Sequence, residues 1–396
     1  MSELMLEKAM TYSDLVEVKG NDKAFLTTKT RPEFEKINHS GHISLVDLFC
    51  GAGGITLGIL EAAASLGKKV NVELAVDIDE KALNVYIDNF PAANAIHSDV
   101  LSIFESDIRS PLNAQEKKLQ KTISNLDFLV GGPPCQGHSD LNNFSRRKDH
   151  KNALYFVMAR AAKIFKPNFV IIENVPGAKH DKNNVFLNTA NELKDIGYNV
   201  SFETINLFDI GVPQKRKRLI LIASKANLVN INEIIELYKT QPKSVHWAIQ
   251  DLMQLDSQDT LMDMPSKPSK DNLKRIDYLF KNNIYDLPNE QRPPCHQKGN
   301  HTYKSIYGRL HWDEPSQTIT SGFYSMCMGR YVHPQLPRTL TAHEAARLQF
   351  FPDYFSFAEA KTRTSLATII GNAVPPKLSF VLVHGILRLL NRGECK

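Results

Sequence analysis

Short apolar runs typical of buried strands alternate with longer segments of helical spacing over residues 42–224. In the longer segments the apolar side chains recur every three or four positions, which indicates amphipathic helices. The predicted strands cover residues 42–49, 70–77, 126–132 and 168–174, and the predicted helices cover residues 55–67, 80–90, 152–165 and 186–197. Strands that alternate with such helices predict βαβ units and a doubly wound, mostly parallel α/β sheet.

Two further apolar runs, residues 199–208 and 218–224, close this pattern. Only nine residues separate them, too few for a helical crossover, so we expect an antiparallel hairpin at an edge of the sheet. After residue 224 prolines are scattered among His, Asn, Gln and Tyr, until helical spacing returns at residues 341–351 and 376–392. We therefore predict four parts: a polar extension (1–42), the first part of the sheet domain (43–224), a smaller unit of loops and short strands (225–336), and a return to the sheet domain (337–396).

The composition narrows the class of protein. Apolar residues make up 42% of the 396 positions and charged residues 23%, which is typical of globular domains and excludes wholesale disorder, collagen and coiled coils. No apolar run approaches the ~18–20 residues needed to span a bilayer, and the amino terminus lacks the pattern of a signal peptide. Five scattered cysteines do not read as a disulfide framework. We therefore expect a soluble protein of the cytoplasm.

The charge is weakly positive overall but concentrated locally. Lys and Arg outnumber Asp and Glu by 48 to 43, a net charge of +5, which permits nucleic-acid binding without requiring it. Residues 145–151 carry four cations and one acid, and residues 215–218 are four cations in a row. Each run taken alone is also typical of an ordinary solvated surface, so charge does not identify a partner.

A glycine cluster at residues 51–54 directly follows the first predicted strand. Glycines here allow a tight turn and let backbone amides approach a ligand closely. A dinucleotide fingerprint would need glycine at position 56, which is threonine, so a nucleoside is indicated without a specified pyrophosphate. Asp77 is placed to accept hydrogen bonds from ribose hydroxyls, and Asp99 from an adenine amino group. The alternative is that these residues form ordinary turns and helix caps.

Two further candidate side chains follow later strands. Cys135 lies in the segment GGPPCQG, after the carboxyl end of a strand, where open α/β sheets bind ligands. Nearby cations would lower its pKa and make it a nucleophile, although most cysteines are small buried side chains. Glu173 lies at the end of strand 168–174, where apolar walls would raise its pKa and let it hold or donate a proton. It could instead cap the following helix.

Arg216 and Arg218 alternate in the predicted hairpin and would share one face of an extended segment. A nucleophilic thiol, a proton-holding carboxyl, two arginines and a nucleoside-type cofactor together suit one reaction. A thiolate adds to carbon 6 of a cytosine while an acid hydrogen-bonds or protonates nitrogen 3. Carbon 5 then becomes nucleophilic enough to attack a methyl group on a sulfonium. Removal of the carbon 5 proton and expulsion of the thiol restore the ring.

Six sequence blocks resemble, in order, those of the DNA (cytosine-5) methyltransferase family of bacterial restriction–modification systems. They are spread over nearly all of residues 43–390 and read DLFCGAGG, GGPPCQG, IIENVPG, GVPQKRKR, LTAHEAARLQFFPDYF and IGNAVPP. The resemblance implies S-adenosyl-L-methionine as cofactor, S-adenosyl-L-homocysteine as product and no metal. It also implies that Cys135 is the nucleophile and that Glu173 binds nitrogen 3 and the exocyclic amine. Arg218 would meet the base carbonyl, and Arg216 would help to hold the loop and the flipped nucleotide.

The resemblance also implies which residues line the cofactor: Phe49, Gly51, Gly53, Asp77, Ile78, Asp99, Pro134 and Asn372. His138 stands where the family commonly has phenylalanine, and His343 where it commonly has arginine. A base inside a duplex hides carbon 6, so the cytosine must be flipped out of the stack. We expect residues 138–151 to close on DNA and their cations to contact phosphates. The predicted DNA-contacting residues are Ser139, Arg146, Arg147, Lys148 and Gln214.

The expected substrate is double-stranded DNA, read by residues 225–336 through the major groove, where the bases are distinguishable. Cys295 and Cys327 lack the spacing of a zinc site. We expect a monomer that lies on the nucleoid when bound to DNA, with a cognate restriction endonuclease as a candidate partner. The closest alternative is the same chemistry on tRNA. Methylation of an exocyclic amine needs no thiol, and a DNA-binding module without catalysis or a nicotinamide oxidoreductase fits the residues less well.

Overall fold

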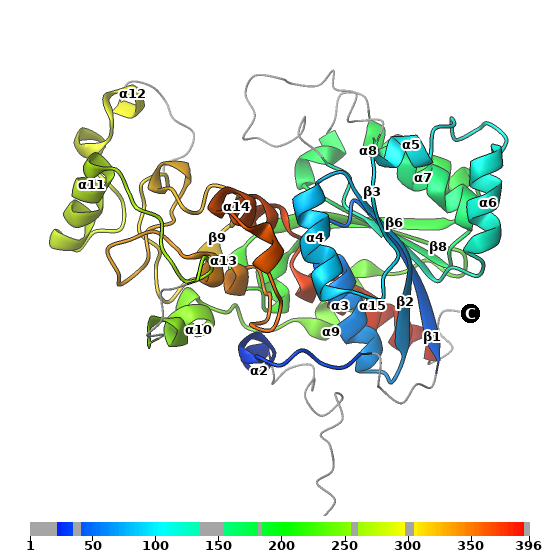
Figure 1. Ribbon diagram of the computed structural model, residues 1–396, viewed down its shortest axis with the longest axis horizontal. Helices are drawn as coiled ribbons and strands as arrows, with labels where there is room; N and C mark the ends of the chain where they lie inside the picture. Colours follow the sequence, from blue (N-terminus) through cyan, green and yellow to red (C-terminus); the bar gives the residue numbers. More distant parts are fainter. Residues whose placement is uncertain are drawn as a thin grey trace, which may run out of the picture.

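The core of the chain is a seven-stranded sheet flanked by helices (Figure 1). A computed structural model describes residues 22–34, 41–134, 154–180, 184–254, 260–297 and 305–391. The strands follow the spatial order β3-β2-β1-β4-β5-β8-β6. Their bounds are β1 His42–Leu48, β2 Lys69–Asp77, β3 Ala95–His97, β4 Phe128–Gly131, β5 Phe169–Asn174, β6 Asn199–Asn206 and β8 Lys217–Ser224.

Strands β1 to β5 are mutually parallel, as the alternation of strands and helices predicts. Strand β8 runs antiparallel to both β5 and β6, which confirms the predicted hairpin. The edge strand is β6, and β8 lies one position inside it. The connection between them contains the 3₁₀ turn η3 (Leu207–Ile210) and the short strand β7 (Gln214–Lys215). This arrangement places the loop of residues 207–217 beside the end of β5.

Two layers of helices cover the two faces of the sheet. Alternate strand residues point to opposite faces, and apolar side chains on both faces are buried by these helices. Leu45 and Val130 belong to one buried cluster, and Val46 and Leu129 belong to the other. The first face packs on α3 Gly54–Ala64, α4 Glu80–Asn89, α9 Ile231–Tyr238 and α15 Pro376–Asn391. The second face packs on α5 Val100–Ile103, α6 Ala114–Thr122, α7 Leu154–Phe165 and α8 Val185–Asp195. The result is a three-layer α/β sandwich (Figure 1).

The last helix, α15, returns to the sheet through a close contact with α3. A Cβ on Gly58 would lie 2.0 Å from the carbonyl oxygen of Pro376, so only glycine permits this approach. The Ser379 hydroxyl donates to the Ile55 carbonyl at 2.9 Å. Through this contact α15 joins the helices that cover the first face of the sheet. Residues Arg363–Leu390 are long and apolar enough to cross a membrane, but 78% of their apolar window is buried inside the protein, as in a core helix.

The remaining elements lie mostly on one side of the sheet (Figure 1). The helices are α2 Asp22–Thr27, α10 Val245–Ile249, α11 Lys270–Lys281, α12 Pro294–Gln297, α13 Ala342–Leu348 and α14 Arg363–Asn372. The strand β9 Ser316–Gln317 pairs with β7. The further 3₁₀ turns are η2 Pro176–His180, η4 Gln250–Gln254, η5 Asn289–Gln291, η6 Met326–Met328 and η7 Ala358–Ala360.

The prediction that residues 225–336 are dominated by loops and short strands missed the helices of this segment. The described part of this segment contains α9, α10, α11 and α12, with a single two-residue strand. Helix α9 packs with the sheet, where its Ile234 occupies the space that a side chain at Gly385 would need. Helix α11 instead belongs to a separate small cluster, whose buried members are Ile276, Leu279, Leu287, Tyr307, Met326 and Val332. Helices α11 and α12 lie at the end of the molecule far from the sheet (Figure 1).

Candidate active site

The predicted site residues meet where the parallel strands end. In the sheet register Leu48 of β1 lies beside Val76 of β2 and Gly131 of β4, and Gly131 lies beside Ile172 of β5. The segments that follow these positions therefore share one edge of the sheet. This is the edge at which open α/β sheets bind ligands.

The glycine turn after β1 has the backbone conformation that its sequence predicts. Phe49, Gly51 and Gly53 have φ values of 60°, 53° and 90°. A Cβ on Gly53 would lie 2.2 Å from the ring of Phe90, so this position requires glycine. A Cβ on Gly51 would meet no atom within 4 Å. The turn thus leaves open space beside Gly51, which a ligand could fill.

Asp77 ties the ends of β1 and β2 together. Its Oδ2 accepts a hydrogen bond from the Gly51 amide at 2.7 Å, and its Oδ1 accepts from the Asp79 amide at 2.8 Å. Burial raises the pKa of Asp77, against the effect of these amide donors. The predicted turn role of Asp77 is therefore real, and it places the carboxyl group beside the glycine turn.

A buried polar chain that the sequence reasoning missed lies behind the turn. The Thr56 hydroxyl donates to Asp47 Oδ2 at 2.7 Å and lies 3.0 Å from the hydroxyl of Tyr86. Tyr86 also packs on the turn, since its Cδ2 would be 2.9 Å from a Cβ on Gly53. Burial raises the pKa of Asp47 to about 7, although Thr56 donates to it. Thr56, the residue that departs from the dinucleotide fingerprint, thus joins β1, α3 and α4. The hydroxyl group of Thr56 was the only feature in the sequence that could have indicated this network.

The other predicted cofactor residues surround the same edge. Ile78 follows β2 and its side chain is 68% exposed, although most large apolar side chains in this protein are buried. Asp99 is exposed and caps α5 by accepting from the Leu101 amide at 2.9 Å. Asn372 is exposed at the carboxyl end of α14. Asp99 thus has the cap role that the sequence left open, while contact of these residues with a cofactor stays a prediction.

Glu173 and Arg218 form an ion pair between Oε1 and Nε. Both side chains are largely buried, and they come from the adjacent antiparallel strands β5 and β8. Glu173 Oε2 faces the loop after β4, since it would lie 3.3 Å from a Cβ on Gly132. The surroundings of Glu173 are therefore not purely apolar as expected, because they include the guanidinium of Arg218. Glu173 pairs with this group and does not cap a helix.

Arg216 and Arg218 are both buried, whereas Lys215 and Lys217 are exposed, as expected for a shared face, but the two arginines have different partners. Its guanidinium donates to the carbonyls of Ile319 at 3.0 Å and Ala373 at 3.2 Å. These bonds tie the hairpin loop to the segment after β9 and to the end of α14. Arg216 and Arg218 therefore make different contacts, and Arg216 positions the backbone around the site.

Gln214 is completely buried, contrary to the expectation of a DNA contact. Its side-chain amide donates to the Leu348 carbonyl at 2.9 Å and to Gln349 at 2.6 Å. Its carbonyl oxygen accepts from the Ile319 amide at 3.1 Å. Both polar atoms are thus used inside the protein, and we assign Gln214 a structural role.

The loop that should carry the nucleophile begins at a defined place. Asn174 donates to the Pro133 carbonyl at 2.8 Å, which fixes the start of the loop against β5. Pro134 is half-buried and ends the described part of this loop. The other residues predicted here lie outside the described residues: Cys135, Ser139, Arg146, Arg147 and Lys148. Their roles stay predictions.

No group of three or more His, Cys, Asp or Glu residues suited to a metal ion occurs in the described part of the chain. Cys295 is exposed, and Cys327 is partly buried. The site thus consists of a glycine turn after β1, a buried acid network behind it, and a glutamate–arginine pair on β5 and β8, which β4 separates from β1.

Comparison with known proteins identifies this arrangement. The sequence profile of the family described as C-5 cytosine-specific DNA methylase matches residues 43–388. The chain belongs to this family. It is a DNA (cytosine-5) methyltransferase, which confirms the family predicted from the six blocks.

Several methyltransferases resemble the enzyme over most of its length. The Type II methyltransferase M1.BsuMI of Bacillus subtilis is 43% identical over 367 residues, which cover 93% of this chain and 85% of that protein. The Type II methylase M.HgiDII of Herpetosiphon aurantiacus is 32% identical, with 88% of this chain and 96% of that protein covered. Among solved structures, the Dnmt2 methyltransferase of S. pombe has a TM-score of 0.60 at 17% identity, covering 88% of this chain and 99% of that chain. That similarity shows a shared methyltransferase fold.

Proposed function

We propose that this enzyme methylates carbon 5 of cytosine at a specific site in double-stranded DNA through a covalent adduct between Cys135 and carbon 6. The observation that carries the proposal is the Glu173–Arg218 pair. It lies beside the loop that runs from Gly132 through Pro133 and Pro134 to Cys135. A carboxyl and a guanidinium side by side match the hydrogen-bonding edge of a cytosine, which presents an amine, nitrogen 3 and a carbonyl.

In the proposed mechanism the cytosine is flipped out of the duplex, since carbon 6 is hidden inside the stack. Glu173 binds nitrogen 3 and the exocyclic amine, and Arg218 binds the base carbonyl. The Cys135 thiolate forms a bond to carbon 6, and Glu173 offsets the electron density that moves toward nitrogen 3. Carbon 5 would then attack the methyl group, whose bond to the sulfonium sulfur breaks and leaves S-adenosyl-L-homocysteine. The carbon 5 proton would pass to a base, and the electron pair of that carbon–hydrogen bond would expel the thiolate and restore the ring.

S-adenosyl-L-methionine supplies an electrophilic methyl group carried on a sulfonium. The residues present fit such a group, because open space faces Gly51 and an exposed Ile78 follows β2. We propose that Asp77 and Asp99 hold the ribose and the adenine amine, and that Ile78 lies against the adenine ring. Phe49, Gly53, Pro134 and Asn372 would complete the cofactor site. Asp77 can do so while it keeps its bonds to the Gly51 and Asp79 amides, since a carboxylate accepts several donors.

We assign DNA recognition to the unit around α11. Its own small buried cluster separates it from the sheet, so it can vary without disturbing the cofactor site. The cations of residues 145–151 would contact phosphates, which gives affinity but no sequence information. The enzyme would act as a monomer on the nucleoid, as the modification partner of an endonuclease that cuts the same site.

Cytosine-5 methylation of tRNA is the competing function. It is disfavoured because the family that matches residues 43–388 is described as C-5 cytosine-specific DNA methylase, and two relatives at 43% and 32% identity are named Type II enzymes. Purified enzyme, tritiated S-adenosylmethionine and a mixture of unmethylated genomic DNA and tRNA distinguish the two functions. Label that enters only tRNA would overturn the proposed DNA substrate.

The thiol is tested by Cys135→Ala. Transfer of the methyl group should fall by at least about 10⁴-fold, because the covalent step is lost. Calorimetric binding of S-adenosylhomocysteine should stay within about twofold of wild type, which shows that the variant is folded. Sustained turnover by this variant would remove Cys135 from the mechanism.

A further inference from the structure

Helix α2 lies outside the residues matched by the family profile, which begins at residue 43, yet it is built into the molecule. Its Leu26 is completely buried, and the Leu26 carbonyl accepts a hydrogen bond from the Asp353 amide at 3.0 Å. Phe25 stacks on Phe350 with 5.7 Å between ring centroids. Asp22 pairs with Lys377 of α15 at 2.6 Å. The helix therefore joins the sheet side to the segment that follows α13.

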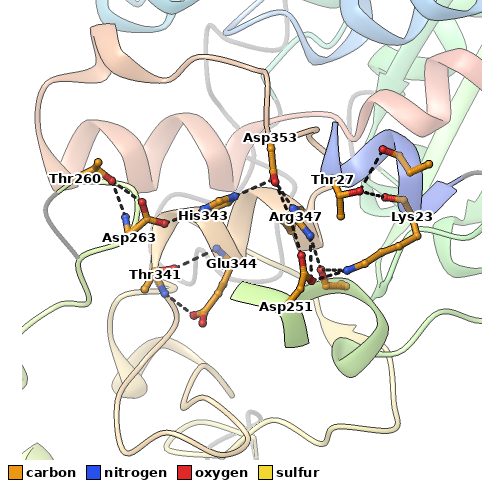
Figure 2. A network of polar contacts seen from close by, with 12 residues as sticks. Lys23, Thr27, Asp251, Thr260, Asp263, Thr341, His343, Glu344, Arg347 and Asp353 are labelled. Atoms are coloured by element: carbon orange, nitrogen blue, oxygen red, sulfur yellow. Dashed lines mark hydrogen bonds and ion pairs between the residues drawn. The ribbon is translucent and has the colours of Figure 1, made fainter. Parts of the chain in front are cut away.

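Lys23 extends α2 toward a third element. Its ammonium pairs with Asp251 of η4 at 2.6 Å and donates to the Ala248 carbonyl of α10 at 3.3 Å. Asp251 also pairs with Arg347 of α13 at 3.1 Å, and Arg347 donates to the same Ala248 carbonyl at 3.1 Å. Figure 2 shows Lys23 and Arg347 converging on Asp251. Residues 248–251 are thus held between α2 and α13.

A second attachment lies further along the same segment (Figure 2). His343 of α13 contacts Asp263 at 2.8 Å and Asp353 at 2.9 Å, and its backbone amide donates to the Met262 carbonyl at 2.9 Å. Arg347 donates hydrogen bonds from Nε and Nη2 to the two carboxylate oxygens of Asp353. The chain is therefore fixed to α13 both before and after residues 255–259, which are not described.

The charges in this network balance. Burial opposes the charged form of His343, but its hydrogen bonds to Asp263 and Asp353 outweigh burial and raise its pKa to about 9. Lys23, His343 and Arg347 thus supply three positive charges against the three carboxylates of Asp251, Asp263 and Asp353. Removing the Lys23 charge would leave a net negative charge on the side of the network that holds residues 248–251.

We propose that α2, through Lys23, is a positioning element that holds residues 245–254 and 260–264 against α13 and so sets the place of the DNA-recognition unit relative to the active site. The segment leads directly from the sheet side to α11, whose cluster forms that unit. Lys23 acts through Asp251 and Arg347 and contacts neither cofactor nor cytosine. This inference rests on the proposed function in one respect only, namely that the unit around α11 recognises DNA.

The test compares Lys23→Met with the conservative Lys23→Arg in the full chain. Lys23 and Asp251 are about one-third to two-fifths exposed, so the pair is worth little by itself and the effect should be modest. We expect Lys23→Met to raise the KM for unmethylated genomic DNA about threefold to fivefold. Its kcat at saturating DNA and its affinity for S-adenosylhomocysteine should stay within twofold. Lys23→Arg should restore the wild-type KM.

Hydrogen exchange measures the positioning without any activity. In Lys23→Met, amides of residues 245–254 should exchange at least about threefold faster, while those of β8 in the sheet should be unchanged. The exposed pair of Lys239 and Glu236 provides a matched control, and Glu236→Gln should alter neither region. Unchanged exchange at 245–254, or equal losses of DNA and cofactor affinity, would overturn the proposal. Failure of the wild-type enzyme to methylate DNA would instead contradict the proposed function and leave the exchange result as an independent test.

Discussion

The sheet and the proposed recognition unit around α11 are held together in different ways. The sheet is buried on both faces by two large clusters of apolar side chains. The proposed recognition unit has six buried apolar residues of its own, and two ion pairs on α13 hold the segment that leads to it. The neighbouring residues Leu310 and Tyr331 pack in the larger cluster of the sheet. Burial that is shared over a whole layer is insensitive to one lost contact, whereas a small cluster depends more on each of its contacts. We therefore expect the catalytic geometry to be stiffer than the placement of the recognition unit.

The sharpest test of the catalytic half is Glu173→Gln. The amide keeps the shape of the side chain but cannot carry a proton to nitrogen 3, and it loses the ion pair with Arg218. We expect kcat to fall by about 10²–10⁴-fold, the range of a lost general acid. Affinity for S-adenosylhomocysteine should stay close to wild type, because Glu173 does not line the glycine turn. A kcat within tenfold of wild type would exclude a proton-holding role.

Matched truncations in the two regions test whether they differ in kind. Leu129 of β4 and Leu279 of α11 are both completely buried, so Leu129→Ala and Leu279→Ala should each cost about 2–5 kcal/mol locally. We expect Leu129→Ala to lower the free energy of global unfolding and weaken every activity. Leu279→Ala should raise the KM for DNA and spare S-adenosylhomocysteine binding. Equal loss of cofactor binding in both variants would mean that the two regions form one cooperative unit.

The sequence predicts the sheet well and the unit around α11 poorly. The strands, the glycine turn and the Glu173 strand are signalled by local patterns, since parallel strands are short apolar runs between helices. The Glu173–Arg218 contact also follows from sequence in part, because the nine-residue connection forces β8 to run antiparallel. The side chains meet because β8 inserts between β5 and the edge strand β6, which no local pattern reveals.

The attachment of the recognition unit was largely unpredictable. Lys23 and the Ala248 carbonyl are 225 positions apart, and a polar amino-terminal segment gives no sign of its partners. Helix α11 was missed for another reason. Its apolar residues Leu273, Ile276 and Leu279 have helical spacing, and Ser269 caps it by accepting from the Asn272 amide, but nearby prolines favoured an irregular segment. His343 was noticed as a departure from the family, and the structure shows its two aspartate partners.

The buried chain behind the glycine turn gives a smaller expected effect on the catalytic half. Thr56→Val removes the donor to Asp47 and the partner of Tyr86. Leaving these buried groups unsatisfied should cost about 1–3 kcal/mol of stability, and loosening Tyr86 against Gly53 should weaken S-adenosylhomocysteine binding by about tenfold or less. Thr56→Ser keeps the hydroxyl and should bind as wild type does. Equal binding by all three proteins, measured by calorimetry, would show that the chain does not support the turn.

The pH dependence of stability tests the attachment on α13. Burial lowers the pKa of His343, but the hydrogen bonds and charges of Asp263 and Asp353 outweigh it and raise this pKa to about 9. Because this folded-state pKa exceeds the ordinary value of 6.5, the stabilisation is complete below pH 6.5 and is lost as the pH rises toward 9. We expect up to about 1–3 kcal/mol of stability to disappear over this range. His343→Gln should be less stable at pH 6.5 and should lose less stability between pH 6.5 and 9. Parallel pH profiles of the two proteins would contradict the charged state of His343.

Identification of the methylated atom tests the central claim most directly. Unmethylated DNA is treated with the enzyme and tritiated S-adenosylmethionine and is then digested to nucleosides. The nucleosides are separated and identified by mass spectrometry. The account predicts that all enzyme-dependent label is in 5-methyl-2′-deoxycytidine. Label in N4-methyl-2′-deoxycytidine or N6-methyl-2′-deoxyadenosine would contradict it, because methylation of an exocyclic amine requires neither the Cys135 thiol nor Glu173 at nitrogen 3.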